Sequence, residues 1–273
     1  MHKTLLIMSV FLTLNAYAAC QEEGFFDCGT TGDVKWYLSN DKTTLSIKGN
    51  GEMSSYSAAV DGSIYTTTAP WGQYKSSIQH VDVQSGVTGL GTYAFLGMDQ
   101  VRDVSLPEGL QSIGRSSFNR CRSLSEINIP STVTYIAQYA VQFTDIESVV
   151  VPDSVTRIDE FAFGYNDKLK SIVVGDQVNS ISASAFKGSE NAYVYCQESN
   201  THGGKSCAEL LGSTGIVNGK LKIYTVENGK IKVGSKIYNS LDDLPKYVKR
   251  RIYTVKEAEE AAGNRNTVTI RYR

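Results

Sequence analysis

Cysteines are the residues of this sequence whose spacing most directly suggests chemistry. The five cysteines lie at positions 20, 28, 121, 196 and 207. Cys20 is close to Cys28 in sequence, and Cys196 is close to Cys207; in an oxidising compartment such neighbours form disulfide bonds. We therefore predict the bridges Cys20–Cys28 and Cys196–Cys207, although spacing alone leaves other connectivities open. Cys121 would then be the one unpaired thiol.

Histidine provides little material for catalysis or metal binding. The three histidines are His2, His80 and His202, and the last two are far apart in sequence. A histidine acid–base site or a histidine-rich metal site needs several such groups near one another. We therefore predict no metal site, no cofactor and no histidine-based catalysis.

The N-terminus is typical of a secretory signal peptide, which we assign to residues 1–18. Lys3 provides a basic start, residues 5–14 are apolar, and Ala16-Tyr17-Ala18 resembles a cleavage site. We expect a secreted or cell-surface protein. A lipoprotein with Cys20 as the lipidated residue is the alternative, and it would break the first disulfide pair. No later stretch approaches the ~20 apolar residues of a transmembrane helix.

Composition indicates a folded protein whose charge is unevenly distributed. The 273 residues are 41% hydrophobic and 20% charged, and the formal net charge of −1 argues against a nucleic-acid partner. Residues 218–273 hold 13 Lys and Arg against 6 Asp and Glu, which gives +7, whereas the remainder holds 14 against 22, which gives −8. Lys246, Lys249, Arg250 and Arg251 form the densest basic cluster. They are either a solvated face or an attachment site for an anionic cell-surface polymer or lipid headgroups.

A repeat of about 23 residues organises the middle of the chain. From residue 86, successive copies align Val, Ile and Phe positions, and a strand-like LxxIxI stretch follows the Phe position in each copy. One copy cannot bury its own apolar side, whereas stacked copies form a continuous core. The pattern predicts a solenoid with a parallel β-sheet. Cys121 falls in the turn after Phe118, where we expect a buried structural thiol rather than a reactive nucleophile.

The repeat resembles the BspA-like class of leucine-rich repeats. The pattern VxxIxxxAFxxCxxLxxIxIPxx recurs with drift over residues 86–188, and the flanking segments from Cys28 to Trp36, Thr44 to Met53 and Ala69 to Trp71 resemble the lead-in of such proteins. The resemblance implies a secreted or surface protein, often bacterial, that binds host or microbial macromolecules. It implies no shared catalytic residues. Val141 and Phe143 depart from the pattern and predict a local distortion.

The resemblance and the pattern together suggest that the outward face of the LxxIxI sheet contacts the partner, a host or microbial surface protein or a glycan. Solenoids present such sheets to ligands. We expect Val150 and Val173 to form a small exposed apolar strip on it. The candidate partner-binding residues are His80, Asp82, Arg102, Asp103, Ser105, Glu126, Asn128, Ser148, Val150, Lys170, Ser171 and Val173.

Two alternatives to a binding module remain open. One is a structural cell-surface component without a specific ligand. The other is a glycan hydrolase that uses Asp82, Asp103 and Glu126, because neighbouring strands ~4.8 Å apart could bring these carboxylates together. We do not favour the enzyme, since nothing in the sequence buries or polarises one of the three.

The flanks predict separate modules on either side of a solenoid over residues 70–196. Residues 19–69 should form an N-terminal β cap with a hairpin over 33–53, a long loop over 54–69, and Trp71 in the cap core. Residues 197–217 read as a linker. Residues 218–273 predict a small basic α+β module, with a hairpin around Asn228-Gly229, a short helix from Thr254 and a last strand from Thr267.

Overall fold

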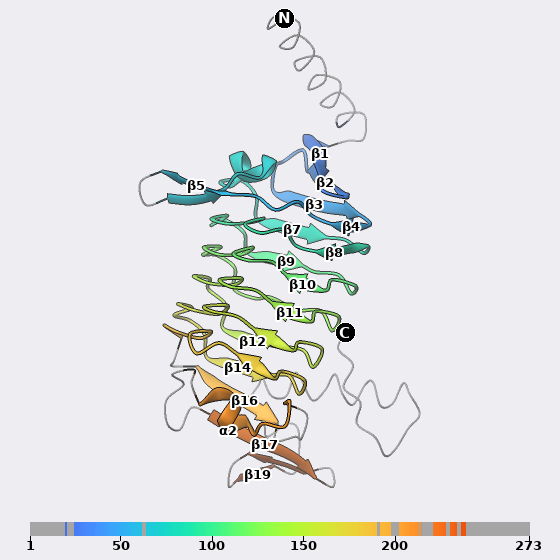
Figure 1. The fold of residues 1–273 in the computed structure, drawn as a ribbon. Coiled ribbons are helices and arrows are strands. Elements are labelled where there is room, and N and C mark those ends of the chain that lie inside the picture. Colours follow the sequence, from blue (N-terminus) through green and yellow to red (C-terminus); the bar gives the residue numbers. More distant parts are fainter. Residues whose placement is uncertain are drawn as a thin grey trace, which may run out of the picture.

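The computed structural model describes residues 20, 25–61, 64–189, 192–197, 202–212, 214, 221–227, 230–233 and 236–238, and its centre is a solenoid of stacked coils (Figure 1). One side of the solenoid carries the strands of the LxxIxI stretches, which run parallel and in register. These strands are β7 (His80–Val83), β9 (Asp103–Ser105), β12 (Ser148–Val150), β14 (Ser171–Val174) and β16 (Tyr193–Gln197). The coil between β9 and β12 has no assigned strand here, so this side is divided into two sheets.

A second parallel sheet lies on another side of the coils. Its short strands come from the Val and Ile columns and pair one coil to the next, with Ile113 beside Ile136 and Ile136 beside Ile158. The sheet contains β4 (Gly51–Glu52), β8 (Val87–Gly89), β10 (Ser112–Ile113), β11 (Tyr135–Ile136), β13 (Arg157–Ile158) and β15 (Ser180–Ile181). The predicted solenoid is therefore confirmed, and both of its sheets face a shared core.

The Phe column forms the centre of that core. Phe95, Phe118, Phe163 and Phe186 are fully buried. The rings of Phe95 and Phe118 stack with centroids 5.2 Å apart, and those of Phe163 and Phe186 are 6.1 Å apart. Val141 occupies the column between these two pairs and is also fully buried, so the third coil continues the core without an aromatic ring.

Buried polar side chains close the turn that follows the Phe column. The Cys121 thiol donates to the carbonyl oxygen of Phe95, and the Ser189 hydroxyl donates to that of Phe163. Asn166 donates from Nδ2 to the Val141 carbonyl and accepts at Oδ1 from the backbone amide of Thr144. Each coil is thus tied to a neighbour by a hydrogen bond that water does not reach.

The N-terminal end of the solenoid is capped as predicted. β1 (Asp27–Thr31), β2 (Val34–Leu38) and β3 (Thr44–Gly49) form an antiparallel sheet, and β3 then pairs in parallel with β7. The 3-10 helix η1 (Pro70–Tyr74) places Trp71 in the core, where the indole Nε1 donates to the carbonyl oxygen of Ala94 at 2.9 Å. Trp71 also contacts the rings of Trp36 and Phe95.

Residues 54–69 are not the long loop that the sequence suggested. They contain the antiparallel hairpin formed by β5 (Ala58–Asp61) and β6 (Ile64–Thr67). The sequence between these strands is Gly62-Ser63 after Asp61, a turn signal, and the residues that follow it, Ile64 to Thr67, have high β propensity. The high content of Ser, Thr and Gly in the segment obscured this pattern.

The C-terminal segment continues the solenoid sheet. β17 (Leu221–Glu227) pairs in parallel with β16, and β18 (Lys230–Val233) and β19 (Lys236–Tyr238) follow as antiparallel neighbours, so the predicted hairpin is confirmed. Helix α2 (Cys207–Leu211) lies within the expected linker, and a capping box between Ser206 and Glu209 begins it. The predicted helix from Thr254, the last strand and the basic cluster lie outside the described residues.

The structure contains both predicted disulfides. Cys20 is bonded to Cys28 and Cys196 to Cys207, and Cys121 is the free, buried cysteine. The first bridge fastens the start of the described chain to β1, and the second joins β16 to α2. In the described part of the chain, no helix has the length and apolar character that crossing a membrane requires.

Candidate functional site

The predicted sheet face is polar, and its charges are largely paired across coils. His80 Nδ1 lies 2.8 Å from Asp103 Oδ2, and Lys170 Nζ lies 2.8 Å from Glu147 Oε2. Asp82 accepts a hydrogen bond from Gln84 Nε2. Exposed ion pairs of this kind contribute about 0–1 kcal/mol each. They give the face a regular ladder of charge rather than a concentrated field.

The register does not bring the three carboxylates of the hydrolase alternative opposite one another. Asp103 is paired with His80 across β7 and β9, and Asp82 is opposite Ser105. Glu126 lies in the coil that has no assigned strand. The register therefore makes Asp82 and Asp103 diagonal neighbours on adjacent strands rather than directly opposite residues.

Exposure of the sheet-face candidates is uneven. Arg102, Asp103, Ser105, Glu126, Asn128 and Lys170 are exposed, and His80, Asp82, Ser148 and Val150 are partly exposed. Ser171 and Val173 are buried, with exposed fractions of 2% and 0%, so the predicted apolar strip is wrong at Val173. The register explains part of this, because Tyr193 lies beside Ser171 and Tyr195 beside Val173, where large rings adjoin the smaller side chains.

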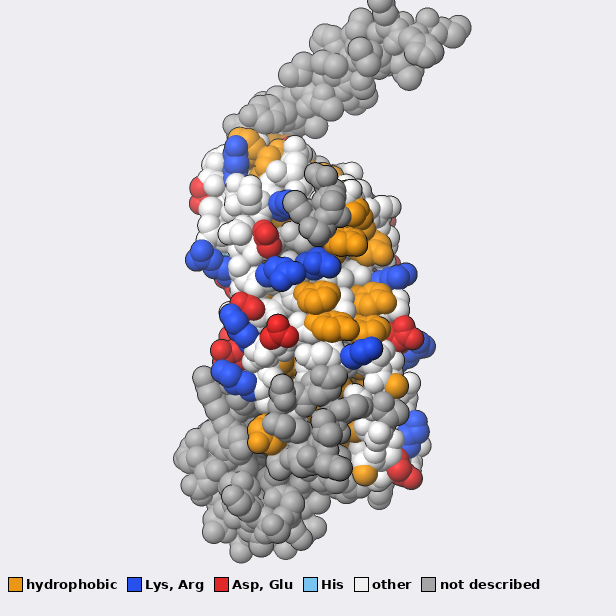
Figure 2. Space-filling model, turned by 90° about the vertical axis from the view of Figure 1, so that its left-hand side faces the viewer, with side chains coloured by type: hydrophobic (Ala, Val, Ile, Leu, Met, Phe, Trp, Pro, Cys, Tyr) orange, Lys and Arg blue, Asp and Glu red, His pale blue; other side chains and the backbone are white. Residues whose placement is uncertain are grey.

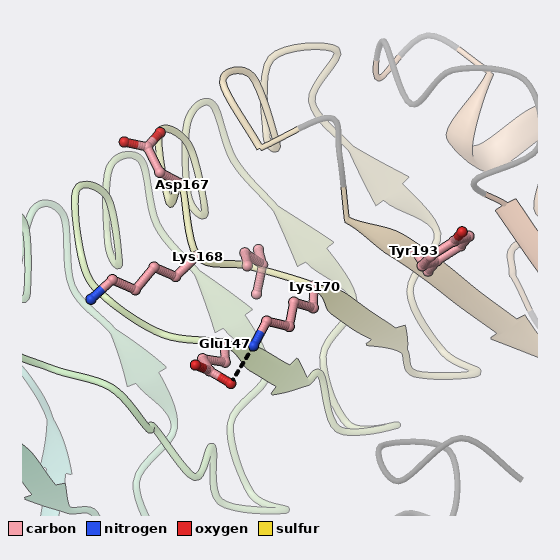
Figure 3. A pocket seen from close by; sticks show the side chains of 6 residues that line it. Glu147, Asp167, Lys168, Lys170 and Tyr193 are labelled. Atoms are coloured by element: carbon pink, nitrogen blue, oxygen red, sulfur yellow. Dashed lines mark hydrogen bonds and ion pairs between the residues drawn. The ribbon is translucent and has the colours of Figure 1, made fainter.

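A shallow hollow of about 460 Å³ lies at the C-terminal part of this face (Figure 3). Figure 3 shows the Lys170–Glu147 ion pair at one side of it and the Tyr193 ring, from β16, at the other. Asp167, Lys168 and Leu169 complete the lining. Since Lys168 is itself paired with Asp145, the hollow has mixed charge and its lysines are already engaged.

A second surface, which we call the aromatic edge, lies along the turns of the coils. It consists of Tyr65, Tyr139, Phe143, Phe161 and Tyr165, whose rings stack in pairs or lie near the same guanidinium group. Tyr65 and Tyr165 are 40% and 36% exposed, and the other three rings are partly exposed. An exposed apolar patch that crosses several coils is a feature of interaction sites.

Four residues of the aromatic edge have left-handed backbone conformations. The φ angles of Tyr139, Phe143, Phe161 and Tyr165 are 60°, 55°, 53° and 54°. The conformation turns each backbone amide toward the next coil: the Phe143 amide donates to the Gly164 carbonyl at 3.2 Å, and the Tyr165 amide to the Lys187 carbonyl at 2.8 Å. The stacking of coils therefore requires this geometry, which glycine adopts at the least cost.

Glycine does occupy this position where space is tight. Phe143 and Tyr165 belong to a column that has Gly97 at its start and Gly188 at its end. A Cβ atom at Gly97 would lie 1.9 Å from the carbonyl oxygen of Tyr65, and one at Gly188 would lie 2.5 Å from the Tyr165 ring. The three positions between these glycines are occupied by larger residues, Arg120, Phe143 and Tyr165, whose side chains have room on the outside of the coils.

Basic side chains surround the aromatic edge. The Arg120 guanidinium lies 4.6 Å from the centroid of Tyr65 and 5.0 Å from that of Phe143. Arg115 lies 5.9 Å from the Tyr139 centroid and Lys187 5.9 Å from that of Phe161. Figure 2 shows basic side chains next to the hydrophobic patch. Cation–π contacts contribute about 0.5–1 kcal/mol at exposed sites.

Sequence reasoning missed the aromatic edge because it followed the buried columns. The signal was present in the repeat: Tyr93, Ser116, Tyr139 and Phe161 form one column of the turn, and residues 97, 120, 143, 165 and 188 form the other. Glycine at both ends of the second column indicates a left-handed turn. A large aromatic residue at a glycine-type position is the feature that would have identified the surface.

The remaining reactive groups are buried and engaged. Burial raises the pKa of the Cys121 thiol far above its usual range, which suppresses the nucleophilic thiolate. His202 lies against the second disulfide, with Nε2 3.6 Å from Cys196 Sγ and Nδ1 hydrogen-bonded to the Val178 carbonyl. Cys196, His202 and Cys207 have ligand atoms within 4.8 Å of one another, but the two sulfurs are joined in a disulfide.

Comparison with known proteins connects this fold to a family. The family described as "BspA type Leucine rich repeat region" matches residues 73–197 with six copies. No match was found among curated proteins. The six copies extend the repeat that starts at residue 86 by the coil that contains β7.

Three solved structures match parts of this chain. A leucine-rich repeat protein from Eubacterium ventriosum is 24% identical, with a TM-score of 0.53 and coverage of 76% of this chain and 48% of its own. A leucine-rich repeat protein from Bacteroides ovatus is 16% identical, with a TM-score of 0.44 and coverage of 62% of this chain and 46% of its own. The T. pallidum leucine-rich repeat protein is 23% identical, with a TM-score of 0.44 and coverage of 65% of this chain and 90% of its own. The chain spans about half the length of the first two. The matched repeats and the observed coils agree: residues 73–197 belong to the BspA-type leucine-rich repeats, and the chain is a leucine-rich repeat protein.

Proposed function

We propose that this protein is a cell-surface binding module, an adhesin, that holds another macromolecule through its aromatic edge. The observation that carries the proposal is the use of aromatic residues at left-handed positions on the surface, such as the partly exposed Phe143 and the exposed Tyr165. A non-glycine residue in this conformation costs about 1–2 kcal/mol. Residues kept in such conformations cluster at ligand-binding sites.

The composition of the aromatic edge supports contact with a macromolecule. Tyrosine, phenylalanine and arginine are enriched at protein interfaces, and tyrosine and arginine are frequent among the residues that dominate binding energy. The edge combines Tyr65, Phe143 and Tyr165 with Arg120, which lies near two of the rings. The rings stack on one another, so little conformational entropy remains to be lost when a partner binds.

The sheet face is the second candidate surface. The hollow beside Lys170 and Tyr193 favours it, and Arg102 is exposed with no ion-pair partner among the described residues. Against it, His80 Nδ1 and Asp103 Oδ2 are already in contact with each other at 2.8 Å. The partner class that the test below covers is a host or microbial surface protein or a glycan.

Export and surface attachment are part of the proposal. The signal-like residues 1–18 and the two disulfides support an oxidising, extracellular location. The charge of +7 on residues 218–273 supports attachment to an anionic cell-surface polymer through Lys246, Lys249, Arg250 and Arg251. The solenoid would then be held at the cell surface with its aromatic edge available to a partner.

A binding array tests the proposal. The full chain is applied to arrayed extracellular matrix proteins and glycans, alongside two variants. The double variant Phe143→Gly/Tyr165→Gly removes two rings at positions where glycine suits the backbone. The control Arg102→Gln/Glu126→Gln changes two exposed sheet-face charges without altering net charge.

We expect the double variant to lose the array signals and the control to keep them. Loss of binding in the control with retention in the double variant would instead assign the function to the sheet face. The absence of any array signal from the unmodified chain would favour the structural alternative. Circular dichroism of both variants shows whether each keeps the fold.

A further inference from the structure

The faces of the aromatic rings point along the stack of coils rather than toward solvent. Tyr139 stacks on Phe161 with centroids 5.4 Å apart and planes at 18°, and Phe143 stacks on Tyr165 at 5.0 Å and 14°. Phe161 and Tyr165, in the same coil, are parallel within 8°. Each of these four rings therefore has one face packed against a ring of the neighbouring coil.

The other faces are occupied as well. Arg115 and Arg120, from the preceding coil, lie near the rings of Tyr139 and Phe143. On the following side, Lys187 lies near the Phe161 ring, and the Tyr165 ring packs so close to Gly188 that a Cβ atom there would be 2.5 Å away. A ligand that approaches from solvent consequently meets the rims of the rings.

Ring rims and guanidinium groups have the same sign of charge. The quadrupole of an aromatic ring is negative on its faces and positive at its edge. No ion-pair partner is present among the described residues for the four cations of this surface, which are Arg115, Arg120, Arg122 and Lys187. The nearby carboxylate of Glu160 accepts a hydrogen bond from Gln138 Nε2 at 2.7 Å. The aromatic edge is therefore both apolar and electropositive.

On the basis of the proposed function, we infer that the partner of the aromatic edge is an acidic protein segment that also carries apolar side chains. Its Asp or Glu carboxylates would bind the guanidinium groups of Arg120 and Arg122, which offer fixed, paired donors. Its aliphatic or aromatic side chains would contact the ring rims of Phe143 and Tyr165. The guanidinium groups and the apolar ring rims that would bind this segment lie within one patch.

The same geometry argues against ligands that bind by stacking. Sugars pack their C–H groups on an exposed aromatic face, and nucleobases stack on such faces. The faces of Tyr139, Phe143 and Phe161 are covered by rings on one side and cations on the other. A glycan would find the rims alone, without the apolar plane that it requires.

A peptide selection tests the chemistry of the partner. A phage library of random linear peptides is selected on the full chain and counter-selected on Phe143→Gly/Tyr165→Gly. We expect the surviving peptides to be enriched in Asp and Glu together with Phe, Leu or Ile. Enrichment of neutral or basic peptides, or no enrichment over the counter-selection, would overturn the inference.

The affinity of an enriched peptide then tests the role of the cations. By fluorescence anisotropy, Arg120→Gln should weaken binding about tenfold or more, since charge-assisted hydrogen bonds are lost. Raised salt should weaken it too. The control Lys35→Gln removes an exposed cation on β2, outside both candidate surfaces, and should leave Kd unchanged. Equal affinities for Arg120→Gln and the unmodified chain would contradict the inference.

The binding function of the aromatic edge and the acidic nature of its partner are contradicted by different results. If an array partner depends on Phe143 and Tyr165 but ignores both Arg120→Gln and salt, the aromatic edge remains the binding surface and its partner is not acidic. If an array partner ignores the double glycine variant, the proposed function itself fails.

Discussion

Phe143 allows the backbone reasoning behind the aromatic edge to be tested by the sign of a stability difference. Its φ of 55° lies in the left-handed region. Phe143→Ala removes the ring and keeps the strain, whereas Phe143→Gly removes both. Comparison of the two variants with each other cancels the lost ring contacts, so that only the backbone contribution remains.

The expected difference follows from two opposing contributions. Alanine in the left-handed conformation costs about 1–2 kcal/mol, and glycine costs about 0.5–1 kcal/mol through its greater freedom in the unfolded chain. Phe143→Gly should therefore be more stable than Phe143→Ala by about 0.5–1 kcal/mol. At a position with negative φ, the alanine variant should instead be more stable than the glycine variant.

Asp167 provides the control position. It is an exposed turn residue that is not among those with positive φ. There the alanine variant should be more stable than the glycine variant by about 0.5–1 kcal/mol. Urea unfolding of all four variants, analysed by linear extrapolation, gives the two differences. The same order at both positions would refute the proposed strain at Phe143.

Three further predictions concern the core, the free thiol and the basic cluster. Phe118→Ala should lower the free energy of unfolding by about 3–5 kcal/mol, because Phe118 is fully buried and stacks on Phe95; a melting temperature within ~2 °C of the original would contradict the register of the solenoid. Cys121 should react with a thiol reagent only after unfolding, because burial raises its pKa, and a peptide map should show the other four cysteines in the two bridges; rapid labelling of the folded chain would contradict this. Reversal of Lys249, Arg250 and Arg251 to Glu should release the full chain from anionic liposomes, as raised salt should, and retention under both conditions would leave the cluster as a solvated face.

The buried part of the fold could be predicted because each apolar column repeats. Val87, Leu110 and Val133 are one such column, and all three are fully buried as the pattern requires. The short spacing of the cysteines predicted the two bridges for a similar reason, since local chain separation limits the alternatives.

The candidate surfaces were harder to predict because they depend on what adjoins an outward side chain. Alternation places Val173 on the outer side of its strand, but it does not reveal the neighbouring Tyr195. Likewise, a turn sequence does not state the sign of φ at Phe143, and stacking between Phe143 and Tyr165 requires the coil-to-coil register. The hairpin of β5 and β6 was missed because its polar residues outweighed its turn signal.

The antiparallel strands at the two ends of the solenoid have an evolutionary consequence. β1 and β2 finish the sheet at one end, and β18 and β19 extend it at the other, while the coils between them pair in parallel with their neighbours on at least one side of the solenoid. Duplication or loss of one coil in the middle leaves both terminal arrangements intact, because each coil contacts only the next. Recombination within the gene would therefore lengthen or shorten the aromatic edge by one step of ~4.8 Å per coil, so that reach and valency toward a partner change without a new fold.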